Sequence, residues 1–185
     1  NVQNSLNDPE QQDRWVTDKA VPAIVSPDRS CGGLLEFAEE GVRKVALDAV
    51  LPMLHGKNGE DGTVQGLLAL AGIPCIGCGL LSSALCMDKS TAHLLASQAG
   101  VKVPRSVLLD QMGSVSDLAK RTEDLAYPLF VKPVNAGSSF GITKITGPGQ
   151  LADAVSLAFR YDSQVIVEEA VEGFEVGCAV MGTSR

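Results

Sequence analysis

The chain has 185 residues, of which 45% are hydrophobic and 20% are charged, and its formal net charge at pH 7 is −7. This hydrophobic content excludes an intrinsically disordered chain. The length is sufficient for one large domain or two small ones with a proper core. A net negative charge without a basic run argues against nucleic acids and anionic membrane surfaces as partners.

The distribution of apolar residues and cysteines indicates a cytoplasmic protein. No apolar run reaches the roughly 20 residues of a membrane span, and residues 1–18 lack a signal-peptide pattern. The five cysteines are irregularly spaced, as expected of reduced thiols. Cys75 and Cys78 form a C-x-x-C pair, but no second ligand pair follows at zinc-site spacing, so we expect small buried core residues.

The first half of the chain predicts a parallel sheet. Residues 23–25 have a weak strand pattern, as do residues 15–17, and residues 34–38 are expected to be irregular. The apolar run 45–54 predicts a buried strand that ends at His55, although Pro52 favours an edge or a bulge. Apolar periodicity predicts a helix over 63–71 that ends at Gly72, followed by a short strand over 73–76. Strand, helix and strand within some thirty residues are typical of a βαβ unit.

The second half predicts an α+β module with antiparallel pairing. A helix is expected from Ser82 or Ser83 to about residue 99, ended by Gly100, then an extended segment over 103–108 and a helix over 115–122. Strands over 129–132 and 142–145 flank a Gly/Ser turn, and an amphipathic helix follows over 151–161. Two further strands are expected over 165–168 and 175–180.

A lysine at a strand end precedes a glycine-bounded turn, Lys132 followed by Gly137, Ser138, Ser139 and Gly141. The glycines allow successive backbone N–H groups to point at one anion, and the lysine supplies positive charge, so this segment is a candidate phosphate-binding nest. An ordinary hairpin turn is the alternative. There is no G-x-x-x-x-G-K-[ST] motif, which excludes a P-loop, and the G-x-G at 77–79 lacks its third glycine.

Further candidates lie elsewhere in the chain. Lys89 stands at a helix start, where a cation is unfavourable unless an anion is near; an exposed lysine is the alternative. Glu168, Glu169 and Glu175 have the chemistry to accept hydrogen bonds from an adenine amine and ribose hydroxyls, or they form a solvated edge. His55 lies where a predicted strand leads into a helix, the place where open α/β sheets bind ligands. The helix N-terminus there would also favour a substrate carboxylate. A hydrogen-bonded core histidine is the alternative.

Four stretches together resemble the D-alanine–D-alanine ligase family of ATP-grasp enzymes. They are HGKNGEDGTVQG at 55–66, SALCMDK at 83–89, VKPVNAGSSFG at 131–141 and VEEAVEGFE at 167–175. The sequences of the second and third stretches are most similar to those of the VanG-type D-alanine–D-serine ligases of glycopeptide resistance.

The resemblance implies a reaction and its partners. ATP would phosphorylate D-alanine to a D-alanyl phosphate, and the amine of a second D-amino acid, D-alanine or D-serine, would displace phosphate. The product would enter peptidoglycan precursors, and the resemblance to the resistance ligases implies a role in vancomycin resistance. The resemblance also implies Mg²⁺, with ligands expected beyond residue 185, and a homodimer.

The resemblance also assigns roles by motif. Lys89 and Lys132 would hold the phosphates, and Lys132 would approach the adenine. The turn from Gly137 to Gly141 would cover the triphosphate, with the Ser139 amide donating. Ser138 would orient the substrate, and His55 and Glu60 would lie near the D-alanine pocket. The remaining nucleotide contacts would come from Glu168 to the adenine amine, from the backbone of Glu169 and Val171, and from Glu175 to the ribose.

The chain departs from the family pattern at both ends. The family's glycine-rich first turn and its amine-binding glutamate have no match before residue 45, which predicts an internal stretch of about half a family-length enzyme. We therefore expect an incomplete Rossmann-like domain over 1–78, a central ATP-grasp subdomain over 79–171 and the start of another over 172–185. Nucleotide binding without turnover is one alternative, and another ATP-grasp carboxylate–amine ligase is a second.

Overall fold

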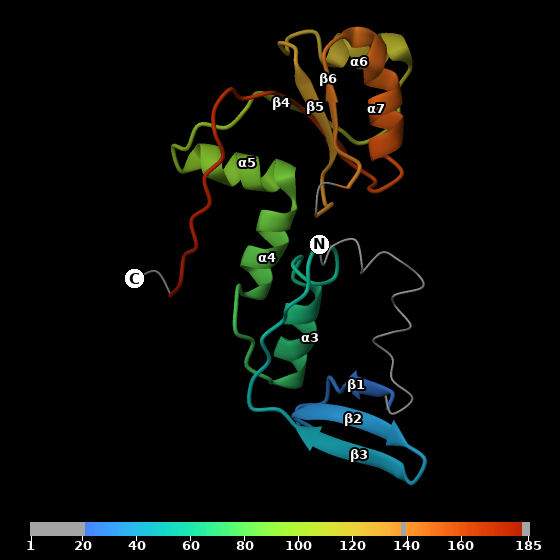
Figure 1. Ribbon diagram of the computed structural model, residues 1–185, viewed down its shortest axis with the longest axis vertical. Helices are drawn as coiled ribbons and strands as arrows, with labels where there is room; N and C mark the ends of the chain where they lie inside the picture. Colours follow the sequence, from blue (N-terminus) through green and yellow to red (C-terminus); the bar gives the residue numbers. More distant parts are fainter. Residues whose placement is uncertain (1–20, 138–139, 183–185) are drawn as a thin grey trace. The chain divides into compact units, whose positions relative to one another are not determined.

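The computed structural model describes residues 21–137 and 140–182. Within these residues the chain divides into two compact units. The first unit comprises residues 21–54 and 58–83, and the second comprises residues 55–57, 84–137 and 140–182. Figure 1 shows the elements of both units in the colours of the sequence.

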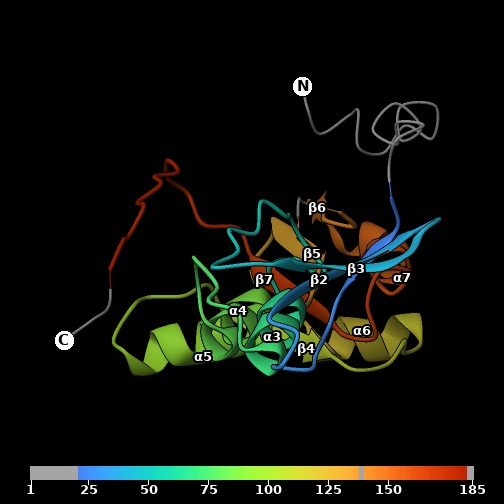
Figure 2. The same cartoon turned by 90° about the horizontal axis from the view of Figure 1, so that it is seen from below.

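The first unit contains an antiparallel three-stranded sheet with the order β1-β2-β3. The strands are β1 (Ala23–Val25), β2 (Gly33–Ala38) and β3 (Gly41–Ala46), and β2 with β3 forms a long hairpin that is clear in Figures 1 and 2. The strand over 23–25 is confirmed, whereas the prediction of an irregular segment over 34–38 is wrong. All six residues of β2 pair with β3, because a strand that lacks strict polar alternation is still stabilised by its partner.

The strand predicted over 45–54 is also wrong. Only its first two residues belong to β3. The rest of the run, residues 47–54, forms a single parallel bridge, between Val50 and Cys75. Pro52 has no N–H to donate to a ladder, and Leu51 and Met53 are exposed. The parallel pairing expected of a βαβ motif is present only at this bridge among the described residues of the first unit. The three-stranded sheet β1-β2-β3 of the first unit is antiparallel.

Helix α3 (Thr63–Ala71) has the predicted bounds and joins the two sides of that bridge. Gly72 ends it in the left-handed conformation, with φ of 71°. Leu68, Ala71 and Ile73 form the small core of this unit. Cys75 packs against that core but Cys78 is exposed, so the prediction of two buried cysteines is wrong for Cys78.

The single helix predicted up to residue 99 is two helices, α4 (Leu80–Met87) and α5 (Lys89–Gln98). Asp88 between them is extended, with φ of −76° and ψ of 104°, and its carboxylate accepts a hydrogen bond from the Thr91 N–H at 2.7 Å. This N-cap satisfies one of the free donors at the start of α5 and separates it from α4. Gly100, with φ of 83°, follows the end of α5 as predicted.

The second unit contains an antiparallel four-stranded sheet with the order β4-β7-β5-β6. Its strands are β4 (Ser106–Leu109), β5 (Leu129–Pro133), β6 (Thr143–Ile145) and β7 (Val165–Glu169). The helices are α6 (Val115–Arg121) and α7 (Leu151–Ala158), the latter preceded by the 3-10 turn η1 (Pro148–Gln150). The predicted antiparallel α+β module is confirmed, with element ends shifted by a few residues.

The sheet of the second unit has a core face and an open face. Side chains alternate along a strand, so Leu129 and Val131 of β5 are buried with α6 and α7 in a core of twelve residues. Phe130 and Lys132 point to the other face. Glu168 of β7 stands opposite Phe130 in the pairing register and therefore shares this face.

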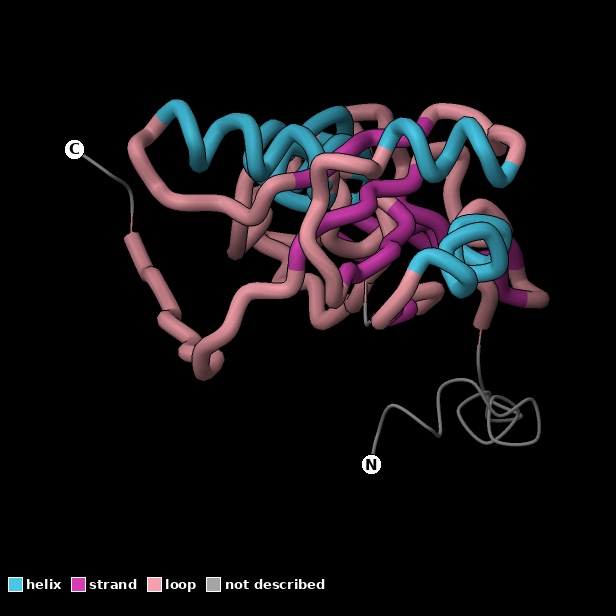
Figure 3. Tube along the Cα trace, turned by 90° about the horizontal axis from the view of Figure 1, so that it is seen from above, coloured by secondary structure: helices cyan, strands magenta, loops and turns pink. Residues whose placement is uncertain are grey.

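The strand predicted over 175–180 is wrong. The described chain from residue 170 to residue 182 is irregular and ends as loop in Figure 3. Its apolar side chains Phe174, Val176 and Val180 are exposed, and no described strand pairs with it. A strand pattern without a partner strand does not form a sheet.

Among the described helices none is long and apolar enough to cross a membrane.

Candidate functional site

The open face of the sheet carries a partly buried ion pair. Lys132 of β5 contacts Glu168 Oε1 of β7 through its Nζ atom. The two residues are diagonal neighbours across the strand pair, a spacing that long side chains can bridge. Glu168 is only 6% exposed. The Lys132 Nζ atom also lies 5.1 Å from the centroid of the Phe130 ring, within reach of a cation–π interaction.

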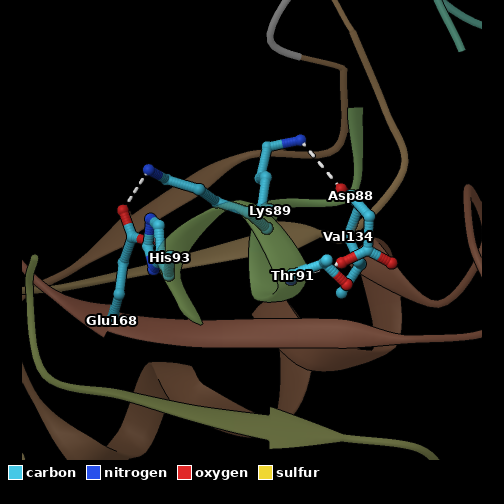
Figure 4. Close-up of polar contacts among 7 residues, drawn as sticks. Asp88, Lys89, Thr91, His93, Val134 and Glu168 are labelled. Carbon is cyan, nitrogen blue, oxygen red and sulfur yellow. Dashed lines mark hydrogen bonds and ion pairs between the residues drawn. The ribbon is translucent and has the colours of Figure 1, made fainter. Parts of the chain in front are cut away.

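A second ammonium group lies close to the first. Lys89 is the first residue of α5, and its Nζ atom donates to the backbone carbonyl oxygens of Val134 at 3.2 Å and Ala136 at 2.6 Å. Figure 4 shows Lys89 extended toward Val134. Burial lowers the pKa of Lys89, and the positive charge of Lys132 lowers it further. The two lysines repel each other, and Lys89 lies at a helix N-terminus. An anion bound there would relieve this repulsion and interact favourably with the helix dipole.

The glycine-bounded turn follows β5 directly. Gly141 has φ of 69°, and a Cβ atom there would lie 2.6 Å from the Tyr161 ring, so a glycine is required at this position. Phe140 and Tyr161 stack with their centroids 6.5 Å apart. Ser138 and Ser139 lie outside the described residues, and their assigned roles stay predictions. The turn is therefore held on its C-terminal side by aromatic packing.

An aspartate holds the other end of the turn, and the sequence analysis missed it. Asp162 Oδ2 accepts hydrogen bonds from the backbone N–H of Asn135 at 2.6 Å and from its side-chain amide at 3.1 Å. A charged acceptor with two donors is among the stronger hydrogen-bond arrangements. No motif pointed to Asp162, because it is 27 residues from its partner.

A pocket of about 250 Å³ lies beside this turn within the second unit, and His55 lines it. Its wall also includes Lys57, which adds a cationic side chain to the imidazole. A Cβ atom on Gly137 would lie 2.7 Å from the Cα atom of Gly56, so the two backbones approach as closely as glycines permit. The complete lining is His55, Gly56, Lys57, Asn135, Ala136, Gly137, Phe140 and Tyr161. Its chemistry suits a small ligand with a carboxylate.

The other predicted residues have different surroundings. Glu60 is exposed in the turn before α3 of the first unit. Glu169 uses its carboxylate to accept from the Ala126 N–H at 2.9 Å, and its own N–H donates to the Arg105 carbonyl at 3.0 Å. Val171 and Glu175 are exposed in the irregular segment after β7. Their assigned nucleotide contacts stay predictions.

His93 is a further residue of this region that the sequence analysis missed. Its Nε2 atom lies 3.8 Å from Glu168 Oε2. The available signal was its spacing, because His93 is four residues after Lys89 and residues four apart share a helix face.

The chain is similar in sequence to two family models and to several known proteins. Residues 2–78 match the family described as D-ala D-ala ligase N-terminus, and residues 95–185 match D-ala D-ala ligase C-terminus. The chain is 49% identical over 168 residues to a putative D-alanine–D-lactate ligase of Streptomyces coelicolor, covering 91% of this chain and 47% of the relative. It is 45% identical to the vancomycin B-type resistance protein VanB of Enterococcus faecalis, with the same coverage of both chains.

A solved structure shares the fold. The VanG D-Ala:D-Ser ligase from Enterococcus faecalis superposes with a TM-score of 0.78 at 49% identity, covering 89% of this chain and 47% of that one. The chain thus spans about half the length of the relatives it matches. With two family matches that together cover most of its residues, the chain belongs to the D-alanine–D-alanine ligase family.

Proposed function

We propose that the protein acts as an ATP-dependent ligase that joins D-alanine to a second D-amino acid through a D-alanyl phosphate. Its relatives and neighbours are named for D-alanine, D-lactate and D-serine as the second substrate, and we keep D-alanine or D-serine as the proposed acceptors. The product would serve peptidoglycan precursor synthesis, with vancomycin resistance as the consequence of an altered acceptor. We further propose a homodimer and the domain division 1–78, 79–171 and 172–185.

The observation that carries the proposal is the grouping of Lys89, Lys132 and Glu168. Lys89 begins α5 and is near enough to Lys132 for the two charges to repel, and the buried Glu168 carboxylate stands on the sheet face beside Lys132. Phosphoryl transfer depends on positioning and charge neutralisation more than on covalent help from the protein. The lysines would neutralise the phosphates, and Glu168 would accept from the adenine amine.

The proposed reaction has two steps. A carboxylate oxygen of D-alanine attacks the γ-phosphorus of ATP, the bond to the β-phosphate oxygen breaks, and ADP leaves. The neutral amine of the acceptor then attacks the acyl carbon, phosphate leaves, and the nitrogen loses a proton. The pocket lined by His55 and Lys57 would hold the D-alanine carboxylate, and the turn from Gly137 to Gly141 would exclude water from the acylphosphate.

The family implies Mg²⁺, but the described residues do not provide its site. They contain no group of three or more His, Cys, Asp or Glu side chains placed to hold a metal ion.

The test is to incubate the purified protein with ATP, Mg²⁺ and D-alanine, and to measure ADP release and the mass of the product. D-alanine-dependent ADP release with a dipeptide product supports the ligase. Nucleotide binding without ADP release supports the alternative of a binding protein without turnover. Competition between D-alanine and D-serine, read from the product mass, identifies the second substrate.

A further inference from the structure

Two buried polar atoms beside the open sheet face, one on β7 and one on α5, lack hydrogen-bond partners within the described part of the chain. They are Oε2 of Glu168 and Nδ1 of His93. Buried polar groups in proteins are nearly always paired, and an unpaired one costs about 1–3 kcal/mol. The unpaired Glu168 oxygen beside the His93 imidazole indicates a carboxylate whose remaining hydrogen bond can be supplied by this neighbouring side chain.

The geometry connects the two side chains. His93 is on α5, one turn after Lys89, and its Nε2 atom is 3.8 Å from Glu168 Oε2. Figure 4 shows the imidazole beside the Glu168 carboxylate. This distance exceeds the 2.7–3.2 Å of a hydrogen bond, so a shift of about 1 Å would close it. Glu168 Oε1 is already occupied by Lys132.

We infer that His93 is a positioning residue for the nucleotide base: its Nε2–H holds Oε2 of Glu168, so that the carboxylate accepts from an exocyclic amine of the base. This inference rests on the proposed function, in which Glu168 faces adenine. A carboxylate has about four acceptor positions. Lys132 and His93 would take one each, which leaves capacity for the amine.

A purely structural role predicts a different outcome. If the imidazole only packs against Glu168, its loss weakens every nucleotide equally or lowers stability alone. If it orients the carboxylate toward the amine, its loss weakens only nucleotides that carry the amine. The comparison of two ligands therefore distinguishes the two roles.

The experiment measures the binding of two nucleotides to the full chain by calorimetry. One is ADP, and the other is purine riboside 5′-diphosphate, which lacks only the exocyclic amine. The variants are His93→Gln, whose amide nitrogen takes the place of Nε2, and His93→Asn, whose shorter amide does not reach Glu168. Lys144→Ala is the control, because Lys144 also lies over the Phe130 ring but on β6.

We expect His93→Asn to weaken ADP binding about tenfold, the loss of one hydrogen bond to a charged group. The purine analogue should change by less than about twofold, because the group that His93 orients has no partner there. His93→Gln should restore ADP binding to within about threefold of the parent. A thermal melt of each variant shows whether it is folded, and His93→Phe provides a second comparison if the asparagine variant is not.

Equal weakening of both nucleotides, or no weakening of either, would overturn the inference. Failure of the inference is separable from failure of the proposed function through Glu168→Ala, which removes the acceptor for the amine. If that substitution removes the preference for ADP over the purine analogue while His93→Asn does not, the nucleotide site stands and the role of His93 falls. If the parent protein binds neither nucleotide, the proposed function falls and the inference with it.

Discussion

The two units differ most in how much of their apolar surface is buried. The core of the second unit contains twelve buried residues between its sheet and α6 and α7, whereas that of the first contains Leu68, Ala71 and Ile73. In the first unit the strand residues Ile24, Phe37 and Val42 are exposed. Burial is the main source of folding free energy, so most of the stability of the described residues resides in the second unit.

This difference explains where precise chemistry can be placed. Lys132 and Glu168 stand on strands whose opposite faces are packed into the larger core, so their backbones are held rigidly. A binding site needs side chains fixed to within a fraction of an ångström. The small core of the first unit offers less support for its loops, including the turn that carries Glu60.

The strongest test of this comparison is a cavity in the larger core. Leu129→Ala should lower the free energy of unfolding by about 3 kcal/mol, because Leu129 is fully buried and a cavity remains. Urea denaturation measures the change. Leu94→Ala is the matched control, since Leu94 is 60% exposed, and it should cost less than about 0.5 kcal/mol.

The same truncation can be made in the smaller core. Because the two cores share no residue, Leu68→Ala should leave the unfolding midpoint of the second unit in place. A shift of that midpoint as large as the one from Leu129→Ala would contradict the separation of the two cores.

The next largest effect should come from the cationic site. Lys132→Ala should weaken ATP binding by about 2 kcal/mol, since it removes a charge-assisted contact with phosphate. Calorimetric titration with ATP gives the value, and Lys144→Ala is the control with a lysine near the same Phe130 ring. Unchanged affinity in the Lys132 variant would place the phosphates elsewhere.

The lowered pKa of Lys89 predicts a pH dependence of nucleotide binding. Burial and the charge of Lys132 hold this pKa below its usual 10.5, and a phosphate would favour the protonated amine. ATP affinity should therefore fall as pH rises through the lowered pKa, by up to about tenfold per pH unit. Lys89→Arg, which stays charged, should flatten the profile; identical profiles for the two proteins would contradict this.

The lowered pKa of Lys89 also makes the stability of the protein depend on pH. Between the lowered pKa and 10.5, the folded state has released the Lys89 proton and the unfolded state has kept it. Unfolding then takes up a proton, so this group makes the protein more stable as pH rises through that window.

A smaller effect should follow from removal of the cap that separates α4 from α5. Asp88→Ala should lower the free energy of unfolding by about 1 kcal/mol, because the Thr91 N–H loses its acceptor. Asp88→Asn, which keeps a capping oxygen, should retain most of the stability in urea denaturation. If the asparagine variant is as unstable as the alanine variant, the cap is not the reason for the loss.

The smallest effect is expected on the surface of the first unit. Glu36 and Arg43 form an ion pair across β2 and β3, and the Arg43 side chain is 72% exposed. Glu36→Gln should change the free energy of unfolding by no more than about 0.5 kcal/mol, because water screens exposed pairs. A cost above 1 kcal/mol, measured by urea denaturation, would show that this hairpin contributes more stability than its exposure indicates.

The sequence by itself determined the elements that depend on neighbouring residues alone. Helix α3 and its glycine stop follow from apolar periodicity and from the left-handed conformation of Gly72. The strand that carries Lys132 and the family motifs could likewise be read along the chain. The separation of α4 from α5 was also a local signal, the Asp88 cap, and we missed it.

Only the tertiary structure decided which strands pair and which side chains meet. The run 45–54 is apolar enough for a strand, yet it forms one bridge, because pairing requires a partner in register. Asp162 reaches Asn135 across 27 residues, and His93 reaches Glu168 across an even longer separation. Contacts between residues far apart in sequence depend on how helices and strands pack in space, and that packing leaves no periodic trace along the chain.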